Sequence, residues 1–582
     1  MTNFFKHYEF YIGLLFVLFI SILTILPLFR DGFFPIHDDA QIVRVQQMTK
    51  ALQDGQFPVR WVSDLGYGYG YPIFNFYAPL PYYIGSVFDL IGFSPLTATK
   101  IMMGIGMLVA GLTMYILGWE IWRHAGGGVW GAIISAVLYQ YAPYHAVQLY
   151  VRGSVGELYA YAFLPLAVYG FYVLLYEKNR LSTGLLMGII GYVGLILSHN
   201  IIALLFTIFL GLTGVIGGIG GIRRIRGMRK IREKIAWMIM SVVFAFGISS
   251  FFWLPALAEK YYTSVDQVIT TEGSDYHKHF LYIDQLWDSP WGFAGSAPGR
   301  EDGMSFKIGK LHILLGLLGV LGIVGAFREK KKKRFSESLA MWMGIVLLGL
   351  SIFMTLESSV IIWDAFSSFM AYIQFPWRFL VFILFFISLY AGGIVALGKN
   401  QTMLFIITAV ITISVVYVNL KYFNPQAYYH ISQSEYESEY YIKWQISKIS
   451  DEYLPMIFIL PKSEFEIPHS KFDIESGVVE NQVIKTDEQS ATIIVDKTSQ
   501  LLINTAYFPG WRVFIDDQEV SPTIIEGKMQ IFVPQGQHVI RLLFTNTAVR
   551  SLANAISVIS SIILFGTIIW LYKNRYEKND VR

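Results

Sequence analysis

Long apolar runs separated by short polar stretches dominate the pattern of this chain. A helix needs roughly 20 mostly apolar residues to cross a bilayer, and about twelve runs reach that length. Their approximate cores are residues 10–29, 95–122, 129–147, 157–176, 181–198, 201–220, 235–254, 309–327, 338–355, 377–397, 402–420 and 549–571. The pattern predicts a polytopic α-helical membrane protein. We expect the first run to be a retained helix, because it is too long for a signal peptide and lacks a small-residue cleavage site.

Composition and charge agree with this prediction. The chain is 54% hydrophobic and only 15% charged, which exceeds what a soluble core needs. Basic residues fall at Arg123, at Lys178 and Arg180, in 223–234, in 328–334, at Lys399 and in the tail after 571. Threading the predicted helices puts all of them on one side, the cytoplasm, together with both termini. The net charge of +3 therefore reflects topology and implies no nucleic-acid partner, and the absence of cysteine excludes thiol chemistry.

The alternate segments should face outward. They are residues 30–94, 148–156, 198–200, 255–308, 356–376 and 421–548. Strand-like alternation in "ATIIVD", "WRVFID" and "HVIRLLF", with turn signals between, predicts a small β-rich extracytoplasmic domain within 421–548. The expected organisation is a transmembrane domain over 1–420, this β-rich domain, and a last helix with a cytoplasmic tail over 549–582.

The first outer loop, 30–94, opens with an acidic pair in "HDDAQIVRVQQM". After Asp39 the apolar residues recur at helical spacing, which predicts an amphipathic helix along the outer membrane face. Asp38 could cap this helix, with Gln41 completing a capping box. Capping does not exclude catalysis, because a capping carboxylate at the surface stays accessible to a substrate.

Phosphate-binding loops of nucleotide enzymes are missing from the sequence. Neither GxxxxGK[ST] nor a strand-linked GxGxxG occurs. Group transfer at an outer site would therefore need a donor delivered through the lipid. We predict no bound cofactor, and "GSDYHKHF" (273–280) offers too few ligands in a fixed geometry for a metal site.

Several motifs resemble known membrane proteins over nearly the whole chain. They are "HDDAQIVRVQQM", "GQFPVRWVSDLGYGYGYPIFNFYAPLPYYI", "SHN" (198–200), "FFWLPALAE" (251–259) and "QFPWRF" (374–379). They resemble the bacterial membrane proteins called 6-pyruvoyl-tetrahydropterin synthase-related, and the C-terminal "AYFPGWRVFIDDQEV" is similar to YfhO-type proteins. The arrangement looks like that of the GT-C glycosyltransferases. The resemblance implies a GT-C-like fold and transfer of a sugar from a polyprenyl-phosphate donor to a cell-envelope glycan, polymer or lipid.

The resemblance also implies site residues. It places the family's first-loop acid at Asp38, as general base, with Asp39 as a second candidate that caps the helix or holds a cation. A phosphate leaving group needs one base and cations, and no second acid. The candidates for binding donor or acceptor are Arg60, Arg152, Glu157, His199, Gln374 and Arg378.

Structural roles for these residues remain open alternatives. Arg60 and Arg378 could be interfacial cations beside Trp61 and Trp377. Arg152 and Glu157 could pair with each other, and His199 could be a packing histidine. Among whole-protein alternatives, a transporter or flippase would usually show paired halves, which this sequence lacks. A non-catalytic protein of polymer assembly is the other alternative.

Overall fold

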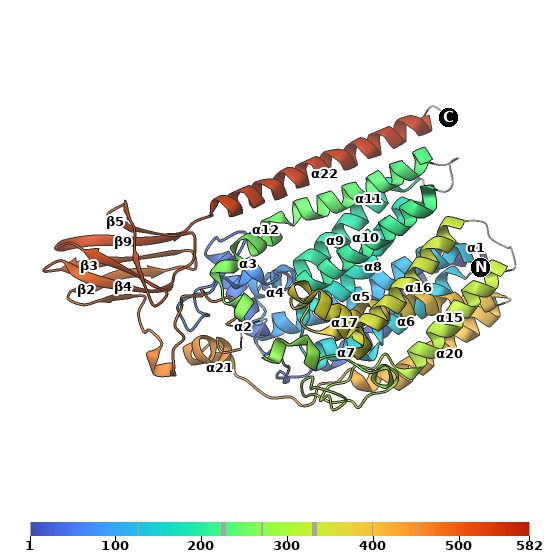
Figure 1. The fold of residues 1–582 in the computed structure, drawn as a ribbon, viewed down its shortest axis with the longest axis horizontal. Helices are drawn as coiled ribbons and strands as arrows, with labels where there is room; N and C mark the ends of the chain where they lie inside the picture. Colours follow the sequence, from blue (N-terminus) through green and yellow to red (C-terminus); the bar gives the residue numbers. More distant parts are fainter. Residues whose placement is uncertain are drawn as a thin grey trace.

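A helical bundle and a small β-domain at one end of it make up the computed structural model (Figure 1). The structure describes residues 2–125, 127–177, 179–222, 228–268, 272–328, 335–398, 400–449 and 451–580. Parts of the basic loops predicted at 223–234 and 328–334, together with Lys178 and Lys399, lie outside these residues. The N- and C-termini lie together at the end of the bundle opposite the strands, because the last helix runs back along the whole bundle (Figure 1).

The helices of the bundle follow the predicted apolar runs. They are α1 (Thr2–Ile22), α5 (Pro95–Trp122), α6 (Gly128–Gln140), α7 (Pro143–Tyr150), α8 (Val155–Tyr176), α9 (Leu181–Ser198), α10 (Asn200–Ile222), α11 (Met228–Ile248), α12 (Ser250–Glu259), α15 (Lys310–Arg328), α16 (Phe335–Thr355), α19 (Leu380–Ala391), α20 (Gln401–Asn419) and α22 (Ala548–Asp580). Shorter helices lie between them: α2 (Gln41–Gln53), α3 (Ile73–Phe76), α4 (Leu80–Leu90), α13 (Val265–Val268), α14 (Ile283–Trp287), α17 (Val360–Ala365), α18 (Ser367–Met370) and α21 (Gln433–Tyr436).

Within the described residues, seven helical segments are long and apolar enough to cross a membrane. An eighth span results if Glu233–Ile248 and Ser250–Tyr262, which meet at 68°, count as one. Shorter apolar helices lie at Gly128–Gln140, Asn200–Gly214, Lys310–Gly325 and Met341–Thr355. Each predicted run coincides with one of these segments, so the polytopic helical class is confirmed.

One predicted run is wrong as a single helix. The run 129–147 is broken, since α6 ends at Gln140 and α7 begins at Pro143, because proline cannot donate the backbone hydrogen bond that would continue α6.

The helix predicted after Asp39 is present as α2, but part of its polar side is not exposed. Gln41, Arg44 and Gln47 are buried along with the apolar residues, since side chains of the first outer loop supply their hydrogen-bond partners.

Two antiparallel sheets form the β-domain. The sheet order is β1-β4-β8-β7 in the first and β2-β3-β9-β5-β6 in the second. The strands are β1 (Phe472–Ile474), β2 (Val478–Ile484), β3 (Glu488–Val495), β4 (Ser499–Ala506), β5 (Trp511–Ile515), β6 (Gln518–Val520), β7 (Thr523–Ile525), β8 (Lys528–Val533) and β9 (Gly536–Phe544). Alternating residues such as Leu501, Ile503 and Ile493 are fully buried, as expected for two sheets packed face to face. The β-rich domain predicted near the C-terminus is therefore present.

The β-domain rests on the first outer loop. The backbone N–H of Ala506 donates to the carbonyl of Tyr69 (2.8 Å), and the ammonium of Lys471 donates to the carbonyl of Gly68 (2.6 Å). The ring of Trp61 contacts that of Trp511 edge to face, at 5.4 Å between centroids. These contacts join two parts of the chain that are about 400 residues apart, and they fix the β-domain over the loop that carries Asp38.

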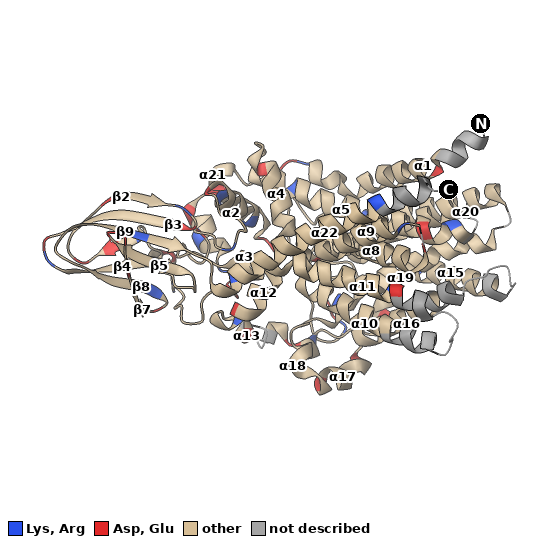
Figure 2. Cartoon of the chain, turned by 90° about the horizontal axis from the view of Figure 1, so that it is seen from above, with Lys and Arg blue, Asp and Glu red and all other residues tan. Residues whose placement is uncertain are grey.

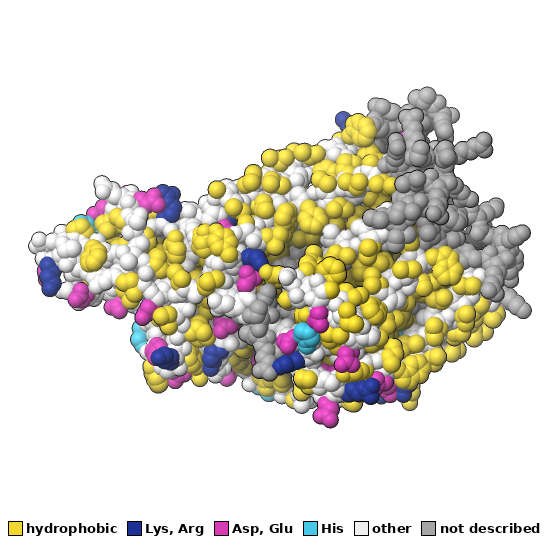
Figure 3. Space-filling view, in the orientation of Figure 1, with side chains coloured by type: hydrophobic (Ala, Val, Ile, Leu, Met, Phe, Trp, Pro, Cys, Tyr) yellow, Lys and Arg dark blue, Asp and Glu magenta, His cyan; other side chains and the backbone are white. Residues whose placement is uncertain are grey.

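Charged residues avoid the middle of the bundle. They gather over the strands, the loops beside them and the opposite helix ends (Figure 2). Exposed hydrophobic side chains instead spread over the helices in the space-filling view (Figure 3). This distribution is the one that a surrounding hydrocarbon layer requires.

Candidate functional site

Asp38 lies in the turn that precedes α2, and its carboxylate collects three donors. Oδ2 accepts hydrogen bonds from Gln41 Nε2 (3.1 Å) and the Tyr77 hydroxyl (3.3 Å), and Oδ1 faces a guanidinium nitrogen of Arg44 at 3.4 Å. We call these four residues the Asp38 group. The Asp38 side chain nevertheless keeps 29% of its surface exposed, whereas Arg44 keeps 2%. The carboxylate is therefore fixed by three protein donors and remains partly accessible to solvent.

The capping interpretation of Asp38 is wrong. The N-cap residue of α2 is Ala40, which makes no side-chain capping bond. Backbone hydrogen bonds from His37 to Val151 (3.1 Å) and from Asp38 to Arg152 (3.0 Å) hold the turn against the 148–156 segment. In this position the Asp38 carboxylate accepts a hydrogen bond from the side chain of Gln41 and, among the described residues, none from the backbone of the first turn of α2.

Asp39 has different surroundings. Its Oδ1 accepts a hydrogen bond from the Tyr429 hydroxyl at 3.4 Å. Burial raises the pKa of Asp39 to about 6, and the charge of Asp38 adds to the rise despite the bond from Tyr429. In the described chain no cation pairs with Asp39 and no helix is capped by it, so both supporting roles predicted for this residue are wrong.

Arg152 and Glu157 form a buried ion pair beside the Asp38 group. An Arg152 guanidinium nitrogen lies 2.6 Å from Glu157 Oε2, and the guanidinium sits over the Trp377 ring at 4.4 Å. Glu157 Oε1 accepts hydrogen bonds from Tyr144 (2.7 Å) and Gln148 (3.2 Å). The alternative in which Arg152 and Glu157 pair with each other is confirmed.

Arg378 lies at the start of the Pro376–Leu397 span and is buried. One guanidinium nitrogen donates to the carbonyl of Ile373 and to Gln374 Oε1 (3.2 Å). Its Nε has no hydrogen-bond partner, and in the part of the chain that the structure describes no carboxylate pairs with it. Gln374, which has a left-handed backbone (φ 63°), also donates to the Ser274 hydroxyl at 3.4 Å.

His199 follows α9 and joins the same region. Its Nδ1 accepts the backbone N–H of Ile202 at 3.3 Å, and the charges of Arg378, Glu157 and Arg152 all act on its ring. The fold thus brings six of the predicted site residues together. They are Asp38, Arg152, Glu157, His199, Gln374 and Arg378.

Arg60 lies in a separate buried cluster. Its two terminal guanidinium nitrogens donate to Asn75 Oδ1 (3.0 Å) and Asn554 Oδ1 (2.9 Å), and Asn75 in turn donates to Glu259. Glu259 pairs with Arg550 of α22 at 3.0 Å. Burial and the charge of Arg550 lower the pKa of Arg60 to about 10. Arg60 therefore ties the first outer loop to the last helix, in a cluster separate from the Asp38 group, and its roles as phosphate ligand or interfacial cation stay predictions.

The sequence pattern does not single out several residues of this region. Arg44 and Tyr77 belong to the first outer loop, and Glu452 belongs to the segment 421–548. Glu452 is half-buried, and its charge interacts with those of Arg44 and Asp38, while burial raises its pKa. The next residue, Tyr453, stacks on Phe76 with 5.4 Å between ring centroids. The signal in the sequence is the short "SDEYLP" (450–455), where an acid and an aromatic residue precede a proline.

A metal site is not indicated at this place. Among the described residues, one group of histidine and acidic side chains is close enough to share an ion: Glu120, His124 and Glu177. It lies at the far end of α5, where Arg123 and Arg180 already pair with Glu120. The Asp38 region instead combines one open carboxylate with buried cations, which suits proton transfer and anion binding.

Two comparisons with known proteins bear on this region. Residues 74–278 match a family model described as "6-pyruvoyl-tetrahydropterin synthase related domain; membrane protein". A protein of Lactococcus lactis subsp. cremoris (strain MG1363), described as uncharacterized, is 26% identical over 263 residues, which are 44% of this chain and 41% of that protein. The match thus spans less than half the length of this relative. The family match includes Tyr77, Arg152, Glu157 and His199, and it agrees with the resemblance of the sequence motifs to this family of membrane proteins.

Proposed function

We propose that this protein is a GT-C-like membrane glycosyltransferase. It transfers a sugar from a polyprenyl-phosphate donor to a glycan, polymer or lipid acceptor of the cell envelope. The observation that carries the proposal is the Asp38 carboxylate, held by three donors yet open on one side, beside a group that contains Arg152, His199 and Arg378. The family match supports a membrane protein and does not specify a reaction.

Asp38 acts as the general base. It takes the proton of the acceptor hydroxyl while the hydroxyl oxygen bonds to the anomeric carbon. The bond between that carbon and the phosphate oxygen breaks, and the polyprenyl phosphate leaves with the bonding electron pair. The leaving group is already a stable anion, so it needs no proton. A single displacement inverts the configuration of the anomeric carbon.

Arg378 is the best candidate for binding the donor phosphate. A buried guanidinium without an ion-pair partner is costly, unless an anion binds next to it. Arg378 bonds to a carbonyl and an amide, both neutral, and its Nε is unpartnered. Arg152, by contrast, is already paired with Glu157 and positions the Asp38 turn through its backbone carbonyl.

The proposed orientation places the reaction outside the cytoplasm. The end of α5 packs beside the start of α1, where Trp119 contacts Phe10. Arg123 and Arg180 both pair with Glu120 at this end of α5, so they lie on the side of the N-terminus. Positive residues favour the cytoplasmic side, so the Asp38 group and the β-domain face outward. There a lipid-linked donor is available without ATP or nucleotide sugars.

The test compares lipid-linked sugars and surface polymers by mass spectrometry in cells that lack the gene and carry either wild-type protein or Asp38→Asn. Asn keeps the size of Asp but cannot accept a proton at neutral pH. We expect the missing glycan to return with wild type and with Asp31→Asn, an exposed acid of the same loop, but not with Asp38→Asn. Equal glycan levels with and without the gene, or full rescue by Asp38→Asn, would contradict the proposal.

A further inference from the structure

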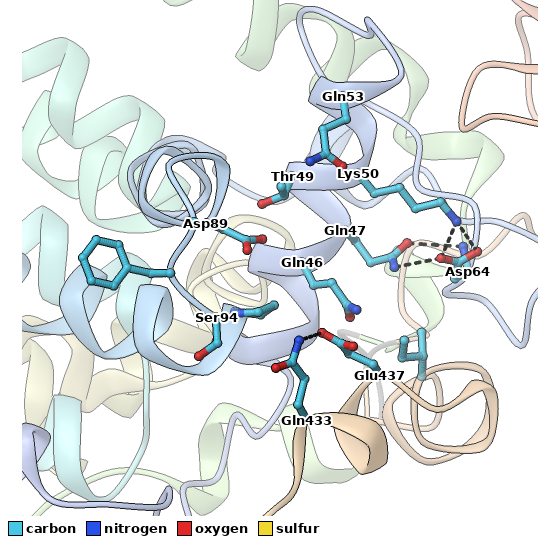
Figure 4. Close-up of a pocket in the computed structure, with 14 residues that line it drawn as sticks. Gln46, Gln47, Thr49, Lys50, Gln53, Asp64, Asp89, Ser94, Gln433 and Glu437 are labelled. Carbon is cyan, nitrogen blue, oxygen red and sulfur yellow. Dashed lines mark hydrogen bonds and ion pairs between the residues drawn. The ribbon is translucent and has the colours of Figure 1, made fainter.

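A polar cavity of about 660 Å³ lies beside α2, away from the Asp38 group. Its walls come from the C-terminal half of α2, Asp64 in the loop after α2, the turn from α4 into α5, and the segment from α21 to Ile442 (Figure 4). Gln46, Thr49 and Gln53 line it from α2, Asp89 from α4, and Gln433 and Glu437 from the α21 segment.

Charges within the cavity are only partly balanced. Lys50 and Gln47 both bind Asp64, at 2.7 Å and 3.0 Å, so that this carboxylate is neutralised (Figure 4). Glu437 accepts one hydrogen bond from Gln433 at 2.9 Å. No cation of the described chain pairs with Asp89 or Glu437. The cavity therefore carries a net negative charge, which disfavours an anionic ligand such as a polyphosphate.

The remaining polar atoms suit hydroxyl groups. Gln46 Oε1 is buried at the cavity wall and has no hydrogen-bond partner. An unpartnered buried acceptor is unfavourable until a donor reaches it. Carboxylates accept hydrogen bonds, while glutamine amides both donate and accept. Such a mixture can bind hydroxyl groups whichever way each one is turned.

An aromatic ring at the rim and the distance of the cavity from Asp38 also favour a carbohydrate ligand. Phe93, at the rim, is 45% exposed and offers an apolar face to the C–H side of a sugar ring. Gln46, the first cavity residue on α2, follows Gln41 by five residues, so the cavity begins roughly 7.5 Å along the helix from the turn that holds Asp38. A short oligosaccharide can span that distance.

We propose that the α2 cavity binds an uncharged, hydroxyl-rich segment of a glycan. Its description as the acceptor subsite rests on the proposed function, because an acceptor held there can extend along α2 and present a terminal hydroxyl to Asp38. The carbohydrate binding itself rests on the cavity alone. Asp89 and Glu437 are the specificity-determining residues.

The test is binding of the purified full-length protein to an immobilised array of neutral, acidic and amino oligosaccharides, without any donor. We expect neutral oligosaccharides to bind, and Asp89→Asn combined with Glu437→Gln to weaken their binding at least tenfold. Glu480→Gln on the exposed edge strand β2 is the matched control and should bind as wild type does. Gln46→Ala, which removes the unpartnered oxygen, should weaken binding without altering either carboxylate.

The outcomes separate this inference from the proposed reaction. Asp38→Asn should bind the array normally while failing to transfer sugar. Absence of any binder, preference for acidic glycans, or unchanged binding by the Asp89 and Glu437 double variant overturns the cavity proposal. Normal binding together with no effect of Asp38→Asn on transfer would overturn the reaction and leave the carbohydrate site standing.

Discussion

Tyr77 serves Asp38 and Arg44 at once: its hydroxyl donates to Asp38 Oδ2 at 3.3 Å, and its ring lies 4.5 Å from the Arg44 guanidinium. The same side chain thus fixes the direction of the carboxylate and packs against the cation that neutralises it. Within the proposed reaction Tyr77 is a positioning residue, and removing its hydroxyl isolates that role.

Tyr77→Phe should keep the ring contact and lose the hydrogen bond. A hydrogen bond to a charged group contributes about 1.5–3 kcal/mol, so we expect transfer to slow by about tenfold or more with little change in thermal stability. Initial rates of the purified protein measure this. Tyr417→Phe, in an exposed tyrosine, is the control. A wild-type rate would show that Tyr77 has no part in the reaction.

Arg378→Met should separate function from stability. Methionine removes a buried charge that no carboxylate balances in the described chain, so we expect the melting temperature to stay equal or rise. Donor use should fall at least tenfold, seen as a higher KM for the polyprenyl-phosphate sugar. Loss of folding, or unchanged donor kinetics, would argue that Arg378 only supports the 373–379 turn.

Arg152→Met, unlike Arg378→Met, should lower the stability of the protein. Breaking a buried ion pair by removing one partner costs about 3–5 kcal/mol, because the other charge is left uncompensated. We expect a marked fall in the melting temperature, and partial recovery when Glu157→Gln is added. Thermal unfolding in detergent measures both. If the double variant is as unstable as the single one, the Arg152–Glu157 pair is not what stabilises this turn.

Asp39→Asn tests the raised pKa of that carboxyl. The folded protein binds the Asp39 proton more tightly than the unfolded chain does, with a pKa of about 6 against 3.8. Ionisation therefore destabilises the fold as the pH rises from about 4 to about 6, by about 3 kcal/mol in total. At pH 7.5 the variant should melt at a higher temperature than wild type, and at pH 4 the two should agree. An equal difference at both pH values would exclude titration of Asp39 as the cause.

Membrane topology can be tested independently of activity. A reporter fused after Leu420 should be external, and one fused after Arg180 cytoplasmic, because the Arg123 and Arg180 end of the bundle lies opposite the strands. Finding both reporters on one side would separate the Asp38 group from its donor and refute the proposed reaction.

Hydropathy predicted the positions of the helices well, because a run of apolar residues long enough to cross the bilayer can be seen within one stretch of sequence. It failed where the hydrogen-bond partners of a polar residue come from elsewhere in the chain. The pattern of α2 suggests a surface helix, yet Tyr82 and Asp64 satisfy Gln41 and Gln47 inside the protein. Its capping signature was equally ambiguous, since Asp38 and Gln41 three residues apart can bond to each other as easily as to the backbone.

The resemblance placed an acid at Asp38. The chemistry of phosphate binding added Arg152, His199 and Arg378 as candidates, so the sequence named part of the candidate site. It did not reveal Glu452, because that residue reaches the Asp38 group only when the segment before the β-domain passes between the first outer loop and residue 263. The surroundings of Arg60 were missed for the same reason, because its hydrogen-bond partner Asn554 belongs to the last helix.

The route of that segment sets the order in which the protein becomes complete during synthesis. Asp38, Arg152 and His199 leave the ribosome early, whereas Glu452 and the strands that rest on Gly68 and Tyr69 emerge near the end. A chain that stops after α20 carries the first outer loop but lacks Glu452, the β-domain that rests on this loop, and α22. The surroundings of Asp38 are therefore complete only when the last quarter of the chain has been translated, and we expect a truncated product to insert into the membrane and to be inactive.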